Sequence, residues 1–141
     1  VTTDCSSSMD YMNESVGKKE FPVGSKTYLD KILKYCKENA ISLVLSSSPN
    51  PLHWNAGKSE AVDQWANNHD IDHIDGNKEL KAIGIDGKTD YIDFGEHLNR
   101  NGARKLTAYI GKYLQTHFHL KDSSGDKEWD KDVESVGVYN D

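Results

Sequence analysis

A histidine preceded by several carboxylates in one short segment is the part of the sequence best suited to chemistry. Residues 89–99 read TDYIDFGEHLN, which places His97 four residues after Asp93. An acid beside a histidine can fix the tautomer of the imidazole and stabilise the imidazolium that forms when the ring takes a proton. Such a pair needs a nucleophile to activate, usually a serine hydroxyl. A loop rich in Asp and Gly ahead of a helix is also typical of a structural cap, so the residue types leave both interpretations open.

Two residues that follow a predicted strand offer a second place for a ligand. Trp54 and Asn55 lie in the loop after the strand that we predict at 41–45. An indole at such a position can line a pocket for an acyl group or a sugar, or it can cover the edge of the core. We take Trp54 and Asn55 as candidate substrate-binding residues.

The sequence HDIDHID at 69–75 collects residue types that bind zinc and related ions. His69 is predicted to end a helix, however, and side chains alternate between the two faces of the strand that follows. We therefore expect no metal site and no cofactor. A metal-binding domain built on His69 and His73 is kept only as an outlying alternative.

Hydrophobic spacing predicts the elements that must position these residues. Apolar residues at helical intervals predict a helix over 26–39, capped by Ser25, with Leu33 on its buried face. The aliphatic run at 41–45 predicts a strand that is covered on both faces. Two prolines exclude helix and central strand from the loop at 46–51 that follows it.

The same pattern repeats further along the chain. We predict a helix over 57–69, a strand over 71–74, a short helical stretch over 77–83 that stops at Gly84, and a long helix capped by Asn99. This alternation predicts an α/β fold in which the two strands are parallel neighbours. In such folds ligands bind beyond the carboxyl ends of the strands, so we expect the site in the loops found there.

Some residues follow from this scheme as the expected core. We expect five side chains to be mostly buried: Leu33, Val44, Trp65, Leu106 and Ile110. Only two core strands are convincing, whereas an independent sheet normally has three or more. We therefore expect a further strand either from the leading segment or from chain upstream of it.

Composition argues against several classes of protein. The chain has 17 basic and 23 acidic residues and a net charge of −6, which argues against nucleic-acid binding because phosphate recognition needs clustered Lys and Arg. No apolar run reaches the roughly 18 residues of a membrane-spanning segment. Two cysteines are too few for a disulfide scaffold. The chain divides into an irregular leading segment at 1–25, a folded part at 26–120 and an acidic extension at 121–141.

Several short stretches between residues 25 and 120 together resemble one known protein family. They are Tyr28–Ile32, Leu43–Leu45, Ser48-Pro49, Trp54-Asn55, and Asp93–Asn99 continued by Gly102-Ala103 and Lys105. The most specific part is His97-Leu98-Asn99 with Gly102-Ala103. Together they resemble the C-terminal half of bacterial SGNH/GDSL-type hydrolase-like proteins, in which a late loop carries Asp-x-x-His and the next helix often opens with Leu-Asn and Gly-Ala.

That resemblance implies part of a flavodoxin-like three-layer α/β/α fold with parallel strands, lacking the N-terminal strands. It implies a serine esterase or acyl transferase acting on O-acyl groups, for example those of a cell-envelope polysaccharide, and so favours a place outside the cytoplasm. The partner would be an acylated small molecule or a glycan. His97 would be the general base and Asp93 its orienting acid, with Asp90 and Glu96 as rivals for the acid.

Two departures from the family pattern support an alternative. The Gly-Asp-Ser nucleophile block is missing, since Asp4-Cys5-Ser6 differs from it and no apolar strand precedes it. Phe94 stands where the family has its Asp, three residues before the histidine. We expect the C-terminal part of a longer protein, inactive by itself because loss of the serine removes most triad catalysis. The alternative is a non-catalytic module that binds a glycan or a protein, and an exposed sheet edge makes self-association a further expectation.

Overall fold

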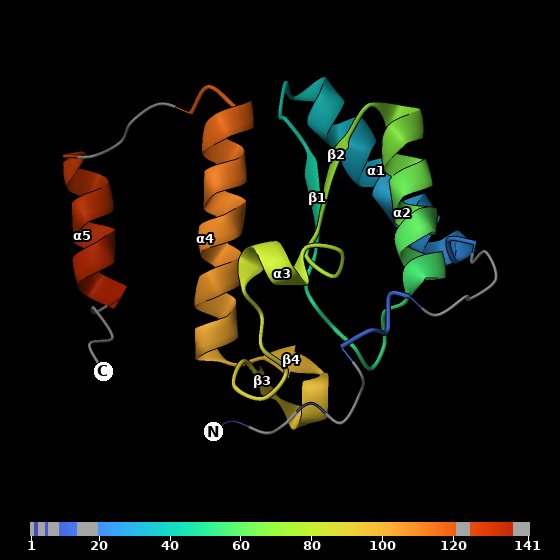
Figure 1. The fold of residues 1–141 in the computed structure, drawn as a ribbon. Helices are drawn as coiled ribbons and strands as arrows, with labels where there is room; N and C mark the ends of the chain where they lie inside the picture. Colours follow the sequence, from blue (N-terminus) through green and yellow to red (C-terminus); the bar gives the residue numbers. More distant parts are fainter. Residues whose placement is uncertain (1, 3–4, 6–8, 14–19, 121–124, 137–141) are drawn as a thin grey trace. The chain divides into compact units, whose positions relative to one another are not determined.

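A pair of parallel strands forms the centre of residues 1–110 in a computed structural model of the chain (Figure 1). The structure describes residues 2, 5, 9–13, 20–120 and 125–136. The strands are β1 (Val44–Ser47) and β2 (Asp72–Asp75), paired in register from their first residues to their last. The predicted parallel pairing is therefore confirmed.

Both strands begin later than the sequence predicts. The first strand is predicted at 41–45, but Ala40 takes a φ of 53°, and the chain pairs with β2 only from Val44 onward. Ser46 and Ser47, predicted as loop, therefore belong to the carboxyl end of β1. The first and last residues of each strand are set by the parallel pairing and not by local hydrophobicity. A segment forms a strand only where a neighbouring strand shares its backbone hydrogen bonds.

Two helices pack together on one side of the sheet: α1 (Val23–Glu38) and α2 (Ala56–His69). Their shared core contains Leu33, Trp65 and Ala66, which are all nearly excluded from solvent. Partly buried residues complete this core: Phe21, Leu29, Leu43, Leu45 and Ile71. The helical spacing that predicts α1 and α2 thus marks their buried faces correctly.

The start of α1 differs from the prediction. Pro22, and not Ser25, occupies the N-cap position, and the Lys26 N–H donates to the Pro22 carbonyl at 2.9 Å. Proline has no N–H to lose and a fixed φ, so it suits the start of a helix better than its interior. Residues 23–25 therefore belong to the helix and not to an irregular leading segment.

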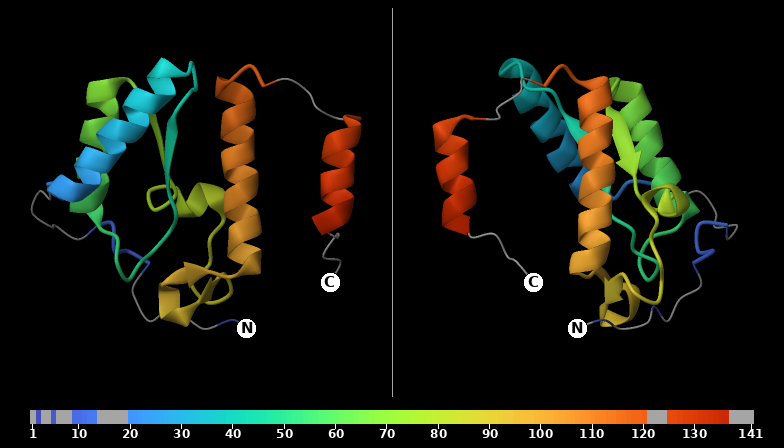
Figure 2. Two further views of the ribbon diagram at one scale, coloured as in Figure 1. Left: turned by 180° about the vertical axis from the view of Figure 1, so that it is seen from behind. Right: turned by 60° about the vertical axis from the view of Figure 1, so that its left-hand side comes forward.

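The long helix α4 (Arg100–His117) begins at an asparagine cap, as predicted. The side-chain Oδ1 of Asn99 accepts the N–H groups of Asn101 at 2.9 Å and Gly102 at 3.1 Å. The part of α4 up to Ile110 lies on the side of the sheet opposite to α1 and α2 (Figure 2). Helices therefore cover both sides of a small parallel sheet, which is a mixed α/β arrangement.

The five side chains expected in the core fall into two groups. Leu33, Trp65 and Leu106 are buried, which confirms the prediction for them. Val44 and Ile110 were predicted to be mostly buried but are only half-buried, so the prediction is wrong for them. Val44 lies in a strand with one described neighbour strand, and Ile110 is the last residue of its unit.

The segment between β2 and α4 is more ordered than the predicted loop. A short helix, α3 (Leu80–Ile83), stops at Gly84, whose φ is 78°. Two short strands, β3 (Tyr91–Ile92) and β4 (His97–Leu98), then pair antiparallel around a single 3-10 turn, η1 (Asp93–Gly95). Strands of two residues are too short for a hydrophobic alternation to predict them.

Residues 111–141 form a second compact unit. It contains the end of α4 and the helix α5 (Lys127–Val136), which lies within the acidic extension. The Trp129 side chain is exposed, and the side chains of Val133 and Val136 lie outside the described residues. Among the described helices, none is both long and apolar enough to cross a membrane.

Two glycines of α4 should respond in opposite ways to substitution by alanine. A Cβ at Gly102 would lie 2.5 Å from the backbone oxygen of Asp90, whereas a Cβ at Gly111 would meet nothing within 4 Å. We expect Gly102→Ala to lower the free energy of unfolding by about 1–3 kcal/mol through overpacking. Gly111→Ala should raise it by about 0.5–1 kcal/mol because alanine favours helix.

Urea denaturation of the two variants measures both effects in one experiment. Both positions lie in the same helix, so both substitutions gain helix propensity. Only Gly102→Ala also introduces a steric clash, and the difference between the two variants therefore measures that clash. Stabilisation by Gly102→Ala would contradict the close approach of α4 to Asp90.

Candidate active site

His97 and Asp93 contact each other directly in the structure. The Nδ1 of His97 lies 3.1 Å from the Oδ2 of Asp93, within hydrogen-bond reach. The side chains are 63% and 59% exposed, respectively, so both are open to solvent and to a ligand. This is the geometry expected of an acid that orients an imidazole, and it also shows that the four-residue spacing permits the contact.

The backbone before His97 takes an unusual path. Asp93, Phe94 and Gly95 have φ values of 53°, 57° and 108°, three left-handed residues in succession. Asp tolerates this region, but a bulky residue such as Phe does so at a cost. A Cβ at Gly95 would also lie 2.6 Å from the Sγ of Cys5, so this position has room only for glycine. Strained backbone of this kind is concentrated at binding and catalytic sites, where surrounding structure holds it in place.

The two rival acids have other partners. The Oε1 of Glu96 faces the Nε2 of His53 at 3.6 Å. Asp90 is fully buried and accepts hydrogen bonds from the Lys105 Nζ at 2.6 Å and the Asp86 N–H at 2.8 Å. Asp93 is therefore the carboxylate that pairs with His97.

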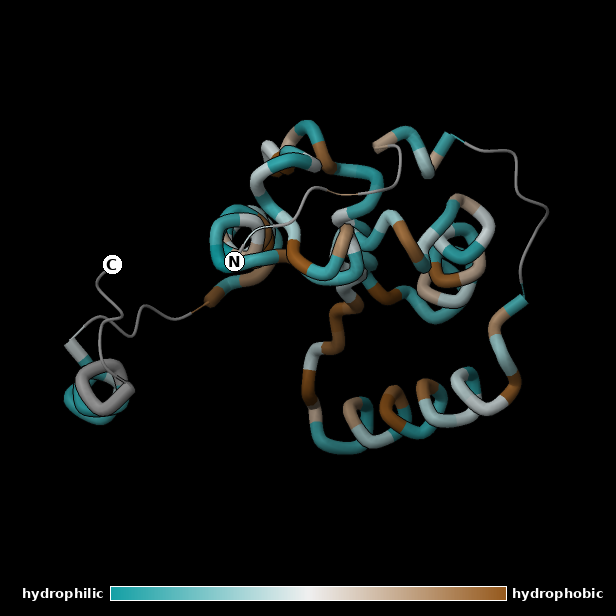
Figure 3. Tube along the Cα trace, turned by 90° about the horizontal axis from the view of Figure 1, so that it is seen from below, coloured by the Kyte–Doolittle hydropathy of each residue, from teal (hydrophilic) through white to brown (hydrophobic). Residues whose placement is uncertain are grey.

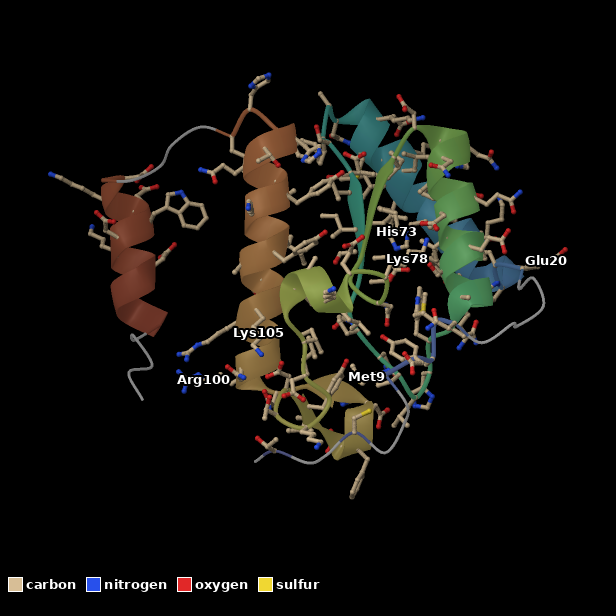
Figure 4. The ribbon with its side chains drawn as sticks, in the orientation of Figure 1. Met9, Glu20, His73, Lys78, Arg100 and Lys105 are labelled. Carbon is tan, nitrogen blue, oxygen red and sulfur yellow. The ribbon has the colours of Figure 1, made fainter. Side chains whose placement is uncertain are left out.

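Asp90 fixes the segment that carries the pair. Burial alone would raise the pKa of this carboxyl, but the hydrogen bonds from Lys105 and Asp86 and the charge of Lys105 outweigh burial and lower it. The Asn101 amide donates to the other carboxylate oxygen. Asp90 thus stays ionised. It links the chain before β3 to the first turns of α4, which carry Asn101 and Lys105 (Figure 4).

His97 opens onto a cleft at the carboxyl end of β1. The cleft has a volume of about 570 Å³. Its lining residues come from the end of β1 and the following loop, from the His97 segment and from α4: Ser46–Asn50, Trp54, Glu96–Leu98, Ala103, Leu106 and Thr107. This is the place where the loops beyond a parallel sheet are expected to bind ligands.

Asn50 holds two walls of this cleft together. Its amide donates to the backbone oxygen of Glu96 at 3.1 Å, and its Oδ1 accepts the N–H of His53 at 2.9 Å. The loop that carries Trp54 is thereby fastened to the segment that carries His97. Asn50 was not among the predicted site residues, although it directly follows Pro49 in the loop after a predicted strand, where a polar ligand group is expected.

The structure separates the two candidate substrate-binding residues. Trp54 lines the cleft, and its indole Nε1 is buried without a hydrogen-bond partner among the described residues. Asn55 does not line the cleft, because it caps α2 and accepts the Lys58 N–H at 3.0 Å. Because the Nε1 is buried, what Trp54 can offer a ligand in the cleft is the surface of its ring and not its N–H.

A second chain of contacts was not predicted from the sequence. The Oγ of Ser47 lies 2.9 Å from the Nε2 of His73, and the Nδ1 of His73 lies 2.7 Å from the Oδ1 of Asp63. Lys78 binds the other oxygen of Asp63 (Figure 4 labels His73 and Lys78). Serine, histidine and acid follow one another here in the order found in serine hydrolases.

We interpret this second chain as a structural clamp. The His73 side chain is only 3% exposed, so a substrate cannot reach the ring. Ser47 and His73 share the face of the sheet that packs on α2, while the neighbouring Ser46 points to the opposite face. The clamp ties β1, β2 and α2 together. The sequence carries no local signal of the clamp, because its three residues come from two strands and a helix.

A buried polar network fastens the carboxyl end of β2. The carboxylate of Asp75 accepts the hydroxyl of Ser59 and, at 2.8 Å, the side-chain amide of Asn77. Asn77 in turn accepts the Tyr11 hydroxyl and the Asn50 N–H, both at 2.8 Å. Since Asn50 also holds the cleft, this network links the cleft to the sheet.

The residues considered for a metal are engaged elsewhere. The Nδ1 of His69 lies 2.7 Å from the backbone oxygen of Trp65, and its ring stacks on the indole of that residue. His73 belongs to the clamp. Within the described part of the chain, no three His, Cys, Asp or Glu side chains come together as metal ligands would.

A larger cleft of about 640 Å³ lies between the start of α1 and α2. Two of its ionisable side chains pair with each other, since Lys26 donates to Asp30 at 2.8 Å, and the Trp65 indole donates to the same carboxylate at 2.9 Å. No histidine lines it. The smaller cleft beside His97 is therefore the better candidate for an active site, because it contains a histidine that can act as an acid or a base.

Comparison with known proteins finds no relative. No family model, no curated protein and no solved structure matches the chain.

Proposed function

We propose that this chain carries the acid–base half of a site that hydrolyses or transfers O-acyl esters. The single observation that carries the proposal is the contact between Asp93 and His97 at a cleft beyond the carboxyl end of β1. The resemblance to the C-terminal half of SGNH/GDSL-type hydrolase-like proteins supports the same assignment. In this proposal the serine nucleophile comes from outside the described residues, and the mixed α/β arrangement is part of a flavodoxin-like three-layer fold.

The roles of the two side chains follow from their geometry. Asp93 accepts the Nδ1–H of His97, which leaves Nε2 to take the proton of an attacking hydroxyl. The hydroxyl oxygen forms a bond to the acyl carbon, the ester C–O bond breaks, and Nε2 returns its proton to the departing oxygen. Asp93 orients the ring and stabilises the imidazolium formed between the two steps.

The cleft suits a small uncharged ester. Its apolar lining residues and the ring of Trp54 can pack on an acyl group. Glu96 at the rim disfavours an anionic ligand close to His97. An acylated small molecule or an acylated glycan has the matching chemistry.

A non-catalytic module that binds a glycan or a protein is the second candidate. Two observations favour it: the pair has the four-residue spacing instead of the family's three, and both of its side chains are exposed. Such a module would use the same cleft, with Trp54 and the surrounding hydroxyl groups as its contacts, and would not require an ester.

Triacetin, a small soluble acetyl ester, and glycerol, the same molecule without acetyl groups, distinguish the two candidates. We expect triacetin to shift the NMR signals of the His97 ring and the Trp54 indole N–H together, with Trp129 as an internal comparison. Glycerol should leave these signals unchanged, because it offers no acyl group to the apolar lining.

The possible outcomes separate the candidates. Equal shifts with glycerol would favour the binding module, and the absence of shifts with both compounds would contradict the ester site. Asp93→Ala should change the tautomer of His97 in ¹⁵N spectra, while the matched variant Glu96→Ala should not. Identical His97 tautomers in both variants would contradict the role of Asp93.

A further inference from the structure

The cleft beside His97 combines apolar contacts with an excess of negative charge. Figure 3 views the chain from the end toward which β1 and β2 run, and it shows hydrophobic and hydrophilic positions mixed in the loops there. Among the lining residues only Glu96 and His97 are ionisable, and no lysine or arginine of the described part of the chain lines the cleft. Asp93, which pairs with His97, adds a second carboxylate close by. The charges at this cleft therefore favour a positively charged ligand.

The backbone of Glu96 is held on both sides, which gives its carboxylate a defined place at the cleft. The Glu96 N–H donates to the backbone oxygen of Asp93 at 3.2 Å, and the backbone oxygen of Glu96 accepts the Asn50 amide at 3.1 Å. The Glu96 side chain is 46% exposed, and its Oε1 lies 3.6 Å from the Nε2 of His53, which is too long for a hydrogen bond. The carboxylate thus keeps most of its capacity to bind a cation from solution.

An aromatic ring lines the same cleft as this carboxylate. Trp54 directly follows His53, so its ring belongs to the loop that faces Glu96. The face of an indole attracts a cation, and tryptophan does so more strongly than tyrosine or phenylalanine. A substituted ammonium group suits this pair, because its carbons pack on the ring while its charge faces the carboxylate.

The protein's own positive groups near Glu96 leave this place open. Lys58 donates its Nζ to the backbone oxygen of His53 and does not line the cleft. A protonated His53 would compete with a ligand for Glu96, but at about pH 8 an ordinary histidine is uncharged. Under that condition the cation that faces Glu96 has to come from the ligand.

We propose that the substrate of this cleft is an ester that carries an ammonium group, and that Glu96 and Trp54 select it. The ammonium group lies between the carboxylate of Glu96 and the ring of Trp54, and the ester group reaches His97, the next residue after Glu96. The proposal deepens the proposed function and rests on it for the ester group, whereas the cation site needs no chemistry at His97. An uncharged ester still fits the apolar lining and binds more weakly.

Acetylcholine and its uncharged isostere 3,3-dimethylbutyl acetate test this proposal, because the two esters differ in one charge and hardly in shape. NMR titration of the Trp54 and His97 ring signals at about pH 8 gives both dissociation constants. We expect acetylcholine to bind at least about fivefold more tightly, and the preference to shrink as added salt screens Glu96. Glu96→Gln should bring the ratio of the two constants close to one, and Trp54→Leu should lower it.

Glu60→Gln is the matched control for Glu96→Gln. It removes the same charge from an exposed position of α2 that does not line the cleft, so the preference for acetylcholine should remain. Equal affinities of the two esters for the wild-type chain would overturn the proposal, as would an equal loss of preference in Glu60→Gln and Glu96→Gln. Because the Glu96 side chain is largely open to solvent, circular dichroism should show a retained fold for this variant even if Trp54→Leu does not fold.

Choline, the cation without the acyl group, separates the cation site from the proposed function. If choline binds as tightly as acetylcholine and depends on Glu96 in the same way, the cation site is supported and the ester function is contradicted. If both esters bind equally well and choline does not bind, the ester function is supported and the cation site is overturned. The absence of binding by all three compounds would overturn both.

Discussion

Replacing Asp90 by alanine is expected to lower the free energy of unfolding by about 3–5 kcal/mol, the usual cost of removing one partner of a buried ion pair. The carboxylate is fully buried and accepts hydrogen bonds from Lys105, Asp86, Asn101 and Thr89. Without it, the Asp86 N–H and the Asn101 amide lose their acceptor, and Lys105 loses its counter-charge. Urea denaturation at neutral pH measures the loss.

The pH dependence of this effect has a definite sign. Since the native pKa of Asp90 lies below its ordinary value of 3.8, its ionised form stabilises the fold fully above that value. The stabilisation disappears as the pH falls below 3.8 and through the native pKa. The difference between wild type and Asp90→Asn should therefore shrink in acid. Asp93→Asn removes an exposed carboxylate and keeps a residue type that tolerates the left-handed backbone there, so it is the matched control for Asp90→Asn and should cost less than about 1 kcal/mol. An equal cost at both positions would contradict the assignment.

Replacing Leu33 by alanine is expected to cost about 2–5 kcal/mol, because it removes buried methyl groups and leaves a cavity. Leu33 is 6% exposed and packs with Trp65 and Ala66. Ile32→Ala, one residue earlier but at a side chain that is 50% exposed, should cost less than about 1 kcal/mol. Chemical denaturation measures both changes. A loss below about 1 kcal/mol for Leu33→Ala would mean that the buried face of α1 is misassigned.

The regular elements of the fold were largely predictable from spacing. Helical periodicity places α1, α2 and α4, and Asn99 and Gly84 mark the start of α4 and the end of α3. The limits of β1 were not predictable, because the pairing with β2 sets them and Ser46 and Ser47 have no strand propensity of their own. The predicted burial of Val44 is wrong for a related reason, because an apolar residue in a strand is buried only if neighbouring elements cover it.

The candidate site was predictable where its residues are close in sequence. Asp93 and His97 lie in one loop, so their contact could be anticipated from spacing alone. The clamp of Ser47, His73 and Asp63 comes from two strands and a helix, and only the folded chain brings these together. For the same reason the sequence could not show that Trp54 faces the cleft while its neighbour Asn55 caps a helix.

The left-handed residues before His97 have a consequence for engineering. A procedure that improves stability alone replaces side chains at positive φ by glycine or asparagine, and Phe94, with a φ of 57°, would be among its first targets. The replacement relaxes the turn at Phe94 and frees the backbone that aims His97. A more heat-resistant version of this chain obtained in that way would therefore keep its sheet and helices and lose the fixed orientation of its histidine. Stabilising substitutions for this protein belong in α1, α2 and the exposed positions of α4, with residues 93–97 left unchanged.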